Sequence, residues 1–203
     1  MNTFDVLIIG GGAAGMSTAL VLGSAKNKPF ASNKTIGIII HQKTSALASG
    51  IFNNVLGIKP GTTGKEILDE GKKHLAETYP HVFQIEKEKV IKIESKAGSF
   101  MITTNKNNYQ AKIIIVAVGP SNLFNIEGLN QYVEPHQKLP AAKERIQLKN
   151  NDHKVSEGIY VVGVLAGWRS QFSIACGSGA SVATDILTEW NNGNPTMVHD
   201  AIE

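Results

Sequence analysis

Four short segments of the chain are apolar at nearly every position, and polar or glycine-rich stretches separate them. They are residues 5–9, 35–42, 112–119 and 158–164. A strand that is apolar on both faces is typical of a buried parallel sheet. Small-residue, mainly apolar stretches at 13–24 and 170–190 predict helices. The order strand, helix, strand predicts a right-handed crossover connection and therefore an α/β fold.

The middle of the chain has a different pattern. Residues 43–64 are rich in Gly, Ser and Asn and are interpreted as a functional loop. Thr63 and Glu66 form a Thr-x-x-Glu capping box, which predicts a helix directly behind them. Residues 82–95 and 98–111 alternate between polar and apolar positions, which predicts half-buried antiparallel strands. The polar stretch 120–157 is expected to be a connector with one short helix near 141–148.

Charge and length exclude some classes of function. The net charge is +3 over 203 residues and is not gathered in one tract, so nucleic acid is not an expected partner. No apolar run approaches the roughly 20 residues of a membrane-spanning helix. No basic-then-apolar leader precedes the first strand, so we expect a cytoplasmic location and no membrane partner.

Cysteine and histidine usage narrows the chemistry further. Cys176 is the only cysteine, so neither an internal disulfide nor a redox Cys-x-x-Cys pair can form. Its small-residue helical surroundings favour a buried, inert thiol over a lone nucleophile. The histidines lack metal-ligand spacing, so no metal site is expected, and the following are interpreted as solvent-exposed: His74, His81, His136, His153 and His199.

A Gly-x-Gly-x-x-Gly motif follows the first apolar strand. Gly10 lets the chain turn sharply, Gly12 lets backbone approach a pyrophosphate, and Gly15 lets the helix press against the sheet. The start of that helix offers N–H groups and the positive end of its dipole to phosphates. Because the motif lies inside a strand–helix–strand unit, it predicts a dinucleotide site.

The second apolar strand lacks the acidic residue that usually binds the ribose hydroxyls in such sites. It ends in His41, Gln42 and Lys43, and no Asp or Glu lies between Asp5 and Glu66. Three interpretations stay open. In the first, neutral His41 or Gln42 forms hydrogen bonds with the ribose. In the second, His41 and Lys43 bind a 2′-phosphate, which would make the ligand NADP. In the third, this end of the strand is simply solvated.

Together these features resemble the flavoproteins with two dinucleotide-binding domains, and within them the thioredoxin reductase type. Four stretches carry the resemblance: residues 5–22, 53–79, 109–122 and 157–186. The resemblance implies a Rossmann-like FAD/NAD(P)-binding three-layer α/β fold, with a central parallel sheet and a small antiparallel β-meander. It implies one domain over 1–203, with a first FAD segment (1–119), a connector (120–157) and a second FAD segment (158–203).

The resemblance also implies an extended FAD. The pyrophosphate would lie on Gly10, Gly12, Ala13, Ala14 and Gly15. The adenosine would lie near His41, Gln42 and the backbone around Val90. The flavin would lie near Asn54 and near the N–H groups of Gln171 and Phe172 at the start of the last helix.

The chain departs from this family in three places. The family inserts an NADPH-binding domain, with its redox Cys-x-x-Cys, between its two FAD segments, and the gap from Gly119 to Gly158 is too short for one. Its Ala-Thr-Gly turn is Ala117-Val118-Gly119 here, and its Gly-Asp pair is Gly163-Val164. The carboxylate expected to hold the ribityl chain is therefore missing, and we expect weaker FAD binding than in the family.

Two functions follow from these observations. The first is a minimal FAD-dependent oxidoreductase that cannot reduce a disulfide by itself and exchanges electrons with NAD(P)H, a small molecule or a protein partner. The second is a non-catalytic FAD- or NADP-binding module or subunit of a larger redox complex. No side chain identifies itself as catalytic. Trp168 and Arg169 are candidates for contacts beside the flavin, or are ordinary surface residues, and a homodimer is a further expectation.

Overall fold

The computed structural model describes residues 2–41 and 45–198. Its centre is a sheet in which parallel strands lie in the order β12 (Ile159–Val161), β8 (Asn108–Val116), β1 (Asn2–Ile9), β2 (Ile36–Ile40) and β5 (Val82–Glu86). The short strand β11 (Lys154–Ser156) pairs antiparallel with β12 at one edge. The buried parallel strands predicted from the apolar segments are therefore confirmed.

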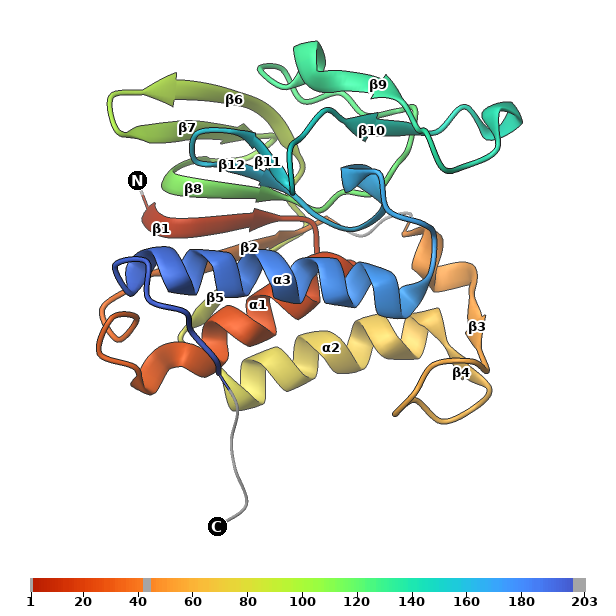
Figure 1. Cartoon of the computed structure of the whole chain (residues 1–203), viewed down its shortest axis with the longest axis horizontal. Coiled ribbons are helices and arrows are strands. Elements are labelled where there is room, and N and C mark those ends of the chain that lie inside the picture. The colour runs from red at the N-terminus through yellow and green to blue at the C-terminus, as the bar shows by residue number, and fades with distance from the viewer. Residues whose placement is uncertain (1, 42–44, 199–203) are drawn as a thin grey trace.

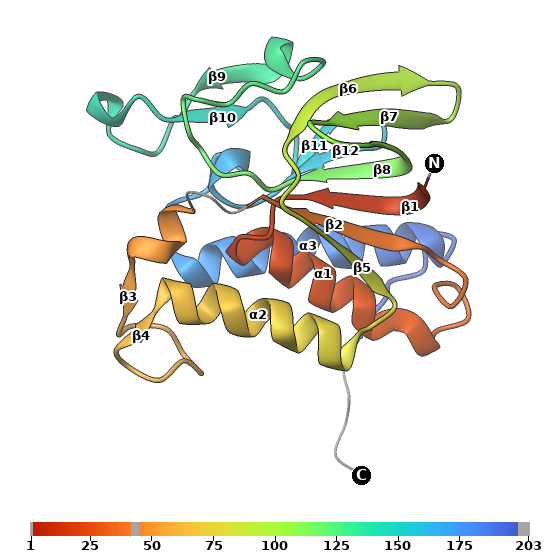
Figure 2. The ribbon, with the colours of Figure 1, turned by 180° about the vertical axis from the view of Figure 1, so that it is seen from behind.

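The sheet lies between two different layers (Figure 1). Helices α1 (Ala13–Ser24), α2 (Gly64–Thr78) and α3 (Phe172–Trp190) cover one face, and the view from behind shows the same arrangement (Figure 2). The other face carries the hairpin of β6 (Val90–Lys96) and β7 (Ser99–Thr104), which continues antiparallel onto β8, and the pair β9 (Val133–Pro135) and β10 (Ile146–Leu148). This is the expected three-layer architecture with an antiparallel meander.

Strand β1 shows why its sequence has no polar face. Val6 and Ile8 belong to the core between the sheet and the helices, whereas Leu7 and Ile9 belong to the core on the opposite face. All four are almost completely buried. Successive side chains of a strand point to opposite faces, so a strand covered on both sides is apolar at every position.

Helices α1 and α3 pack closely because both present small residues. The carbonyl oxygen of Gly179 accepts a hydrogen bond from the Oγ1 of Thr18 at 3.0 Å, and the same hydroxyl bonds the carbonyl of Ala14 at 2.9 Å. A Cβ atom on Gly179 would overlap the Ala14 carbonyl. The small-residue pattern of the two helices therefore lets their backbones meet.

Two predictions for the middle of the chain are wrong. Residues 82–86 form β5, which runs parallel to β2 rather than antiparallel to a neighbour. The predicted helix at 141–148 is a short 3₁₀ turn (Ala141–Lys143) followed by β10. Glu144 has a φ of +48°, which ends the turn, and Leu148 is fully buried against the sheet. Burial of this alternating segment overrode its local helical propensity.

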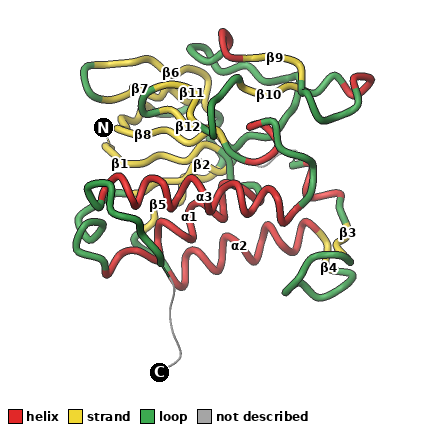
Figure 3. The backbone as a smooth tube through the Cα atoms, viewed as in Figure 1, coloured by secondary structure: helices red, strands yellow, loops and turns green. Residues whose placement is uncertain are grey.

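The loop predicted over residues 43–64 contains short elements of regular structure. Residues 45–63 hold a 3₁₀ turn (Ala46–Ser49) and a two-stranded hairpin, β3 (Ile51–Phe52) with β4 (Thr62–Thr63). Figure 3 shows the hairpin extending beyond the start of α2. Thr63 and Glu66 form the predicted capping box, with each side chain bonded to the backbone of the other.

Candidate functional site

The carboxyl ends of the central parallel strands meet at one edge of the sheet. The backbone N–H of Gly10, just past β1, donates to the Ile39 carbonyl at 2.9 Å, and that of Ala117, past β8, donates to the Ile9 carbonyl at 2.8 Å. The N–H of Val162, past β12, donates to the Val116 carbonyl at 3.0 Å. Helices α1, α2 and α3 all begin at this edge (Figure 1). In open α/β sheets, ligands bind at this end of the strands.

The glycine turn after β1 is built as the motif predicts. Gly10 has a φ of +113°, and a Cβ atom on it would lie 2.5 Å from the Ala117 carbonyl oxygen. A Cβ atom on Gly15 would overlap the Gly10 carbonyl oxygen. At Gly12, by contrast, no heavy atom lies within 4 Å of the Cβ position. Two glycines are therefore required by packing, and the third leaves open space above the start of α1.

The N-terminus of α1 is electrostatically suited to an anion. Gly12 is its N-cap residue and brings no side-chain acceptor, and its first turn holds no acidic residue. The buried Ala14 and half-buried Ala13 continue the turn into the helix. The N–H groups and positive dipole end of a helix that starts in this way attract phosphate.

The N-terminus of α3 has the same character. Gln171 is the N-cap residue, its side chain makes no capping hydrogen bond, and the first turn has no acidic residue. Phe172 packs on Phe52 of β3, with ring centroids 5.4 Å apart. The start of α3 is thus fixed against the hairpin, while Gln171 itself stays exposed.

The segment after β12 passes close to the glycine turn. Gly163 has a φ of +72°, and a Cβ atom on it would lie 2.9 Å from the Cβ of Ala14. The Gly163 N–H donates to Ser178 Oγ of α3 at 2.8 Å. Val164 is half-buried, and its carbonyl oxygen lies 2.9 Å from His136 Nε2. Gly163 therefore joins the starts of α1 and α3, and Val164 brings no carboxylate there.

A mainly apolar pocket of about 170 Å³ lies between the three helices. Its lining includes Gly12, Leu47, Leu68, Phe172 and Cys176. Burial raises the pKa of the Cys176 thiol to about 11, so this thiol stays protonated and is a poor nucleophile. The side chain is half-buried. A wider hollow of about 710 Å³ lies elsewhere, at the amino ends of the strands, next to Asp5 and Lys112.

The other predicted residues have varied positions. His41 is half-buried directly after β2. Val90 is buried, with 4% of its surface exposed, at the start of β6. Asn54 is exposed in the β3–β4 loop, two residues beyond the Phe52 ring that meets Phe172. Ala117 and Gly119 form the turn after β8, where Gly119 has a φ of +80°. Gln42 and Lys43 lie outside the described residues.

The prediction that the histidines are solvent-exposed is wrong for two of them. His136 is 7% exposed and His153 is 4% exposed. His74 is exposed and His81 half-buried, while His199 lies outside the described residues. Each buried ring has hydrogen-bond partners, which is what allows a polar group inside a protein. The prediction of exposure rested on the polar residues that flank these histidines in the sequence, and these residues do not show which side chains are buried in the fold.

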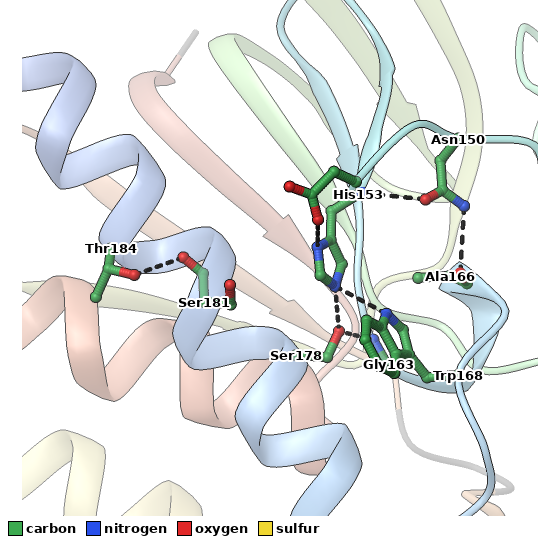
Figure 4. Close-up of polar contacts among 9 residues, drawn as sticks. Asn150, His153, Gly163, Ala166, Trp168, Ser178, Ser181 and Thr184 are labelled. Carbon is green, nitrogen blue, oxygen red and sulfur yellow. Dashed lines mark hydrogen bonds and ion pairs between the residues drawn. The ribbon is translucent and has the colours of Figure 1, made fainter. Parts of the chain in front are cut away.

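His153 is the centre of a network that the sequence did not reveal (Figure 4). Trp168 Nε1–H donates to His153 Nε2 at 3.0 Å, and Ser178 Oγ lies 2.9 Å from the same nitrogen. Ser178 is also the acceptor of the Gly163 N–H. The one available signal was the Asn-Asn-Asp run at 150–152, which is typical of a turn and would place His153 at the start of a strand.

Residues 2–41 and 45–198 contain no cluster of three His, Cys, Asp or Glu side chains able to hold a metal ion. None of their helices is long and apolar enough to cross a membrane.

FAD fits the residues at this edge in part. The open space at Gly12 and two N-termini free of acidic residues suit a pyrophosphate and an electron-rich ring edge. The two expected carboxylates are missing from this site, because His41 follows β2 and Val164 follows Gly163. The chain therefore offers backbone donors and helix dipoles where charge-assisted side-chain contacts were expected.

Comparison with known proteins agrees with this geometry. The family model described as pyridine nucleotide-disulphide oxidoreductase matches residues 4–167. A curated relative, the uncharacterized oxidoreductase CzcO of Bacillus velezensis, is 25% identical over 197 residues, which are 92% of this chain and 52% of the relative. The chain thus spans about half the length of that relative.

Solved structures share the fold. The ferredoxin-flavin thioredoxin reductase of Clostridium acetobutylicum superposes with a TM-score of 0.69 at 17% identity, and the alignment covers 95% of this chain and 99% of that one. A thioredoxin reductase from Gloeobacter violaceus gives a TM-score of 0.73 at 12% identity, covering 100% and 99%.

Proposed function

The chain belongs to the pyridine nucleotide-disulphide oxidoreductase family, and from this premise we propose that it is an FAD-dependent oxidoreductase acting through a single nucleotide-binding domain. The observation that carries the proposal is the pair of helix N-termini, at Gly12 and Gln171, which begin at the same edge of the sheet and have no acidic residue in their first turns. Such a pair suits a cofactor with a negative pyrophosphate and a ring that becomes negative on reduction.

Each end of the cofactor has its own group of residues in this proposal. The open space at Gly12, between the tightly packed Gly10 and Gly15, admits the pyrophosphate to the first N–H groups of α1. The backbone of Gln171 and Phe172 would hold the flavin edge. When bound, FAD supplies a ring that accepts and releases two electrons. The dipole of α3 then stabilises negative charge at that edge.

Electrons would come from outside the chain. The segment between β8 and β12 folds onto the sheet, where Leu129 and Leu148 are fully buried. It contributes β9, β10 and β11 and is too short for a second dinucleotide-binding domain. The neutral Cys176 thiol has no second cysteine to pair with. We therefore propose NAD(P)H from solution, or a reductase partner, as the donor.

A second candidate is a non-catalytic FAD- or NADP-binding module or a subunit of a larger redox complex. The missing carboxylates favour it, because each lost charge-assisted hydrogen bond weakens binding by about 1.5–3 kcal/mol. His41 at the end of β2 suits a 2′-phosphate better than an acidic residue would.

The test is a visible absorption spectrum of the purified chain, followed by denaturation and identification of the released nucleotide. Released FAD supports the cofactor assignment, and a colourless protein that binds NADP instead supports the binding module. A flavin-loaded chain is then mixed anaerobically with NADPH, NADH or a cell extract. Bleaching of the flavin absorbance, with electrons passed on to an added quinone or dye, supports the oxidoreductase. A flavin that none of these donors reduces contradicts it.

A further inference from the structure

His153 occupies a position that is fixed from several directions. Its backbone N–H donates to Asn150 Oδ1 at 3.0 Å, and its carbonyl accepts from the Val161 N–H at 2.9 Å. Asp152 and His153 both have positive φ angles, +45° and +70°. Asn150 Nδ2 also reaches the Ala166 carbonyl at 3.3 Å. The turn that carries His153 is therefore tied to β12 and to the segment 163–168.

The imidazole ring connects that segment to α3 (Figure 4). Its plane is nearly parallel to that of the Trp168 indole, with 16° between the planes and ring centroids 5.8 Å apart. Its Nε2 lies 3.0 Å from Trp168 Nε1 and 2.9 Å from Ser178 Oγ. Ser178 in turn holds the Gly163 N–H. One nitrogen thus links both ends of the segment 163–168 to the helix whose N-terminus belongs to the candidate cofactor site.

The hydrogen-bond chemistry fixes the protonation state of this ring. An indole N–H can only donate, so Nε2 of His153 must be the acceptor. The ring is therefore neutral, with its proton on Nδ1, which faces Asp152 Oδ1 at 3.6 Å. A proton on Nε2 would meet the Trp168 N–H directly, so the protonated ring cannot keep this contact.

We propose that His153 is a positioning residue that holds Trp168 and the segment 163–168 against α3 while its ring is neutral, and that protonation of the ring releases Trp168. The contact is made entirely by residues of this chain. Only its consequence for catalysis, through the start of α3 beside the flavin, rests on the proposed function.

The charged groups around the ring determine when release occurs. Burial lowers the pKa of His153 below its ordinary value, and the charges of Asp152 and of Asp185 on α3 oppose this effect. The Lys138 ammonium lies 5.2 Å from the centre of the Trp168 ring, on the β9–β10 connection. Because the folded pKa is depressed, the stability from this contact is complete above the ordinary pKa of about 6.5. It is lost as the pH falls through the folded value.

The experiment follows Trp168 fluorescence in the flavin-free chain as the pH is lowered from 8 to 4. Trp168 and Trp190 are the two tryptophans, so Trp190→Phe makes the signal specific. We expect the emission to move to longer wavelength in one titration below pH 6.5, while far-UV circular dichroism stays unchanged. His153→Gln retains an acceptor that does not titrate, so its emission should stay at the wild-type pH 8 value throughout. His74→Gln, at an exposed histidine on α2, should keep the wild-type titration.

Two results would overturn the proposal: an emission that does not change until the chain unfolds, or a His153→Gln chain that titrates as the wild type does. If His153→Gln does not fold, the indole N–H resonance of Trp168 in the unsubstituted chain decides. The chemical shift of this resonance must change over the same pH range in which the His153 ring titrates. A chemical shift that changes independently of that ring would reject the proposed hydrogen-bonded contact. A flavin-loaded sample gives a separate readout: titration of Trp168 without a pH-dependent rate of flavin reduction would keep the positioning role and reject only its catalytic consequence.

Discussion

A Cβ atom on Gly15 would overlap the carbonyl oxygen of Gly10. The two residues lie on either side of the turn between β1 and α1, so their contact sets how closely the helix approaches the end of the strand. The same close approach brings Gly12 to the tip of the turn, where nothing lies within 4 Å of its Cβ position. Packing at two glycines therefore creates the open space at the third.

Gly15→Ala should damage the fold itself. The added methyl group meets backbone, which cannot rotate away as a side chain can, so we expect a loss of about 3 kcal/mol or more in the free energy of unfolding. Urea denaturation followed by circular dichroism measures it. Gly177→Ala on α3 is the matched control, because nothing lies within 4 Å of its Cβ position. It should stabilise the chain by about 0.5–1 kcal/mol, and an equal loss in both variants would reject the argument.

Gly12→Asp should separate cofactor binding from stability. Gly12 has a φ of −77°, which any residue adopts, and Asp is a good N-cap, so stability should rise by a few tenths of a kcal/mol. The new carboxylate, however, would occupy the space of the pyrophosphate. We expect FAD affinity, measured by flavin fluorescence titration, to fall about 10- to 150-fold, the factor that corresponds to about 1.5–3 kcal/mol.

The control for this variant is Asn27→Asp, which changes the net charge equally. Asn27 is exposed and lies beyond the opposite end of α1. FAD affinity should be unchanged in it. An equal loss of FAD affinity in both variants would indicate an effect of net charge and would contradict a pyrophosphate site at the glycine turn.

The sequence predicted those parts of the fold that depend on local pattern. The apolar run 5–9 and the glycines at 10, 12 and 15 placed β1, the turn and α1 correctly, because burial on both faces and close helix packing each require specific residue types. Thr63 and Glu66 identified the start of α2 for the same reason. At the site, the open space at Gly12 followed directly from the motif.

Features that depend on distant contacts were not predictable in this way. β5 pairs with β2 across more than forty residues of chain, and its alternating sequence says nothing about the direction of its neighbour. His153 is buried by Trp168 and Ser178, which come from two other elements. Polar residues near His153 in the sequence therefore gave the wrong impression of its exposure.

Glu88→Gln should destabilise the junction between β5 and the meander. The Glu88 carboxylate is buried and accepts hydrogen bonds from Thr104 Oγ1, Asn107 Nδ2 and Tyr109 OH at 2.7–3.0 Å. In the Gln side chain an NH2 group replaces one of the two acceptor oxygens. Its N–H groups would then face hydrogen-bond donors from Thr104, Asn107 or Tyr109. We expect a loss of about 1–3 kcal/mol in the free energy of unfolding at pH 7, measured in urea. Glu77→Gln, on the exposed face of α2, should change stability by less than about 0.5 kcal/mol.

The same carboxylate predicts a pH dependence. Burial would raise the pKa of Glu88, but its three hydrogen bonds outweigh burial and hold the pKa below the ordinary 4.5. A depressed folded pKa gives stability that is complete above 4.5 and is lost as the pH falls through the folded value. Unfolding free energies between pH 3 and 5 should therefore decline less steeply in Glu88→Gln than in the wild type. Parallel curves would contradict the assignment.

Cys176 should be nearly inert and dispensable for flavin chemistry. Its pKa of about 11, against an ordinary 9.0, lowers the thiolate fraction at pH 8 by about 100-fold, and alkylation by iodoacetamide should slow by about that factor. The control is a Ser32→Cys, Cys176→Ala chain, whose cysteine lies at an exposed position and should react at an ordinary rate. Since the chain has no second cysteine, electrons cannot pass through an internal disulfide. Cys176→Ala should therefore keep the wild-type rate of flavin reduction, and a large loss in that variant would show that the thiol takes part in electron transfer.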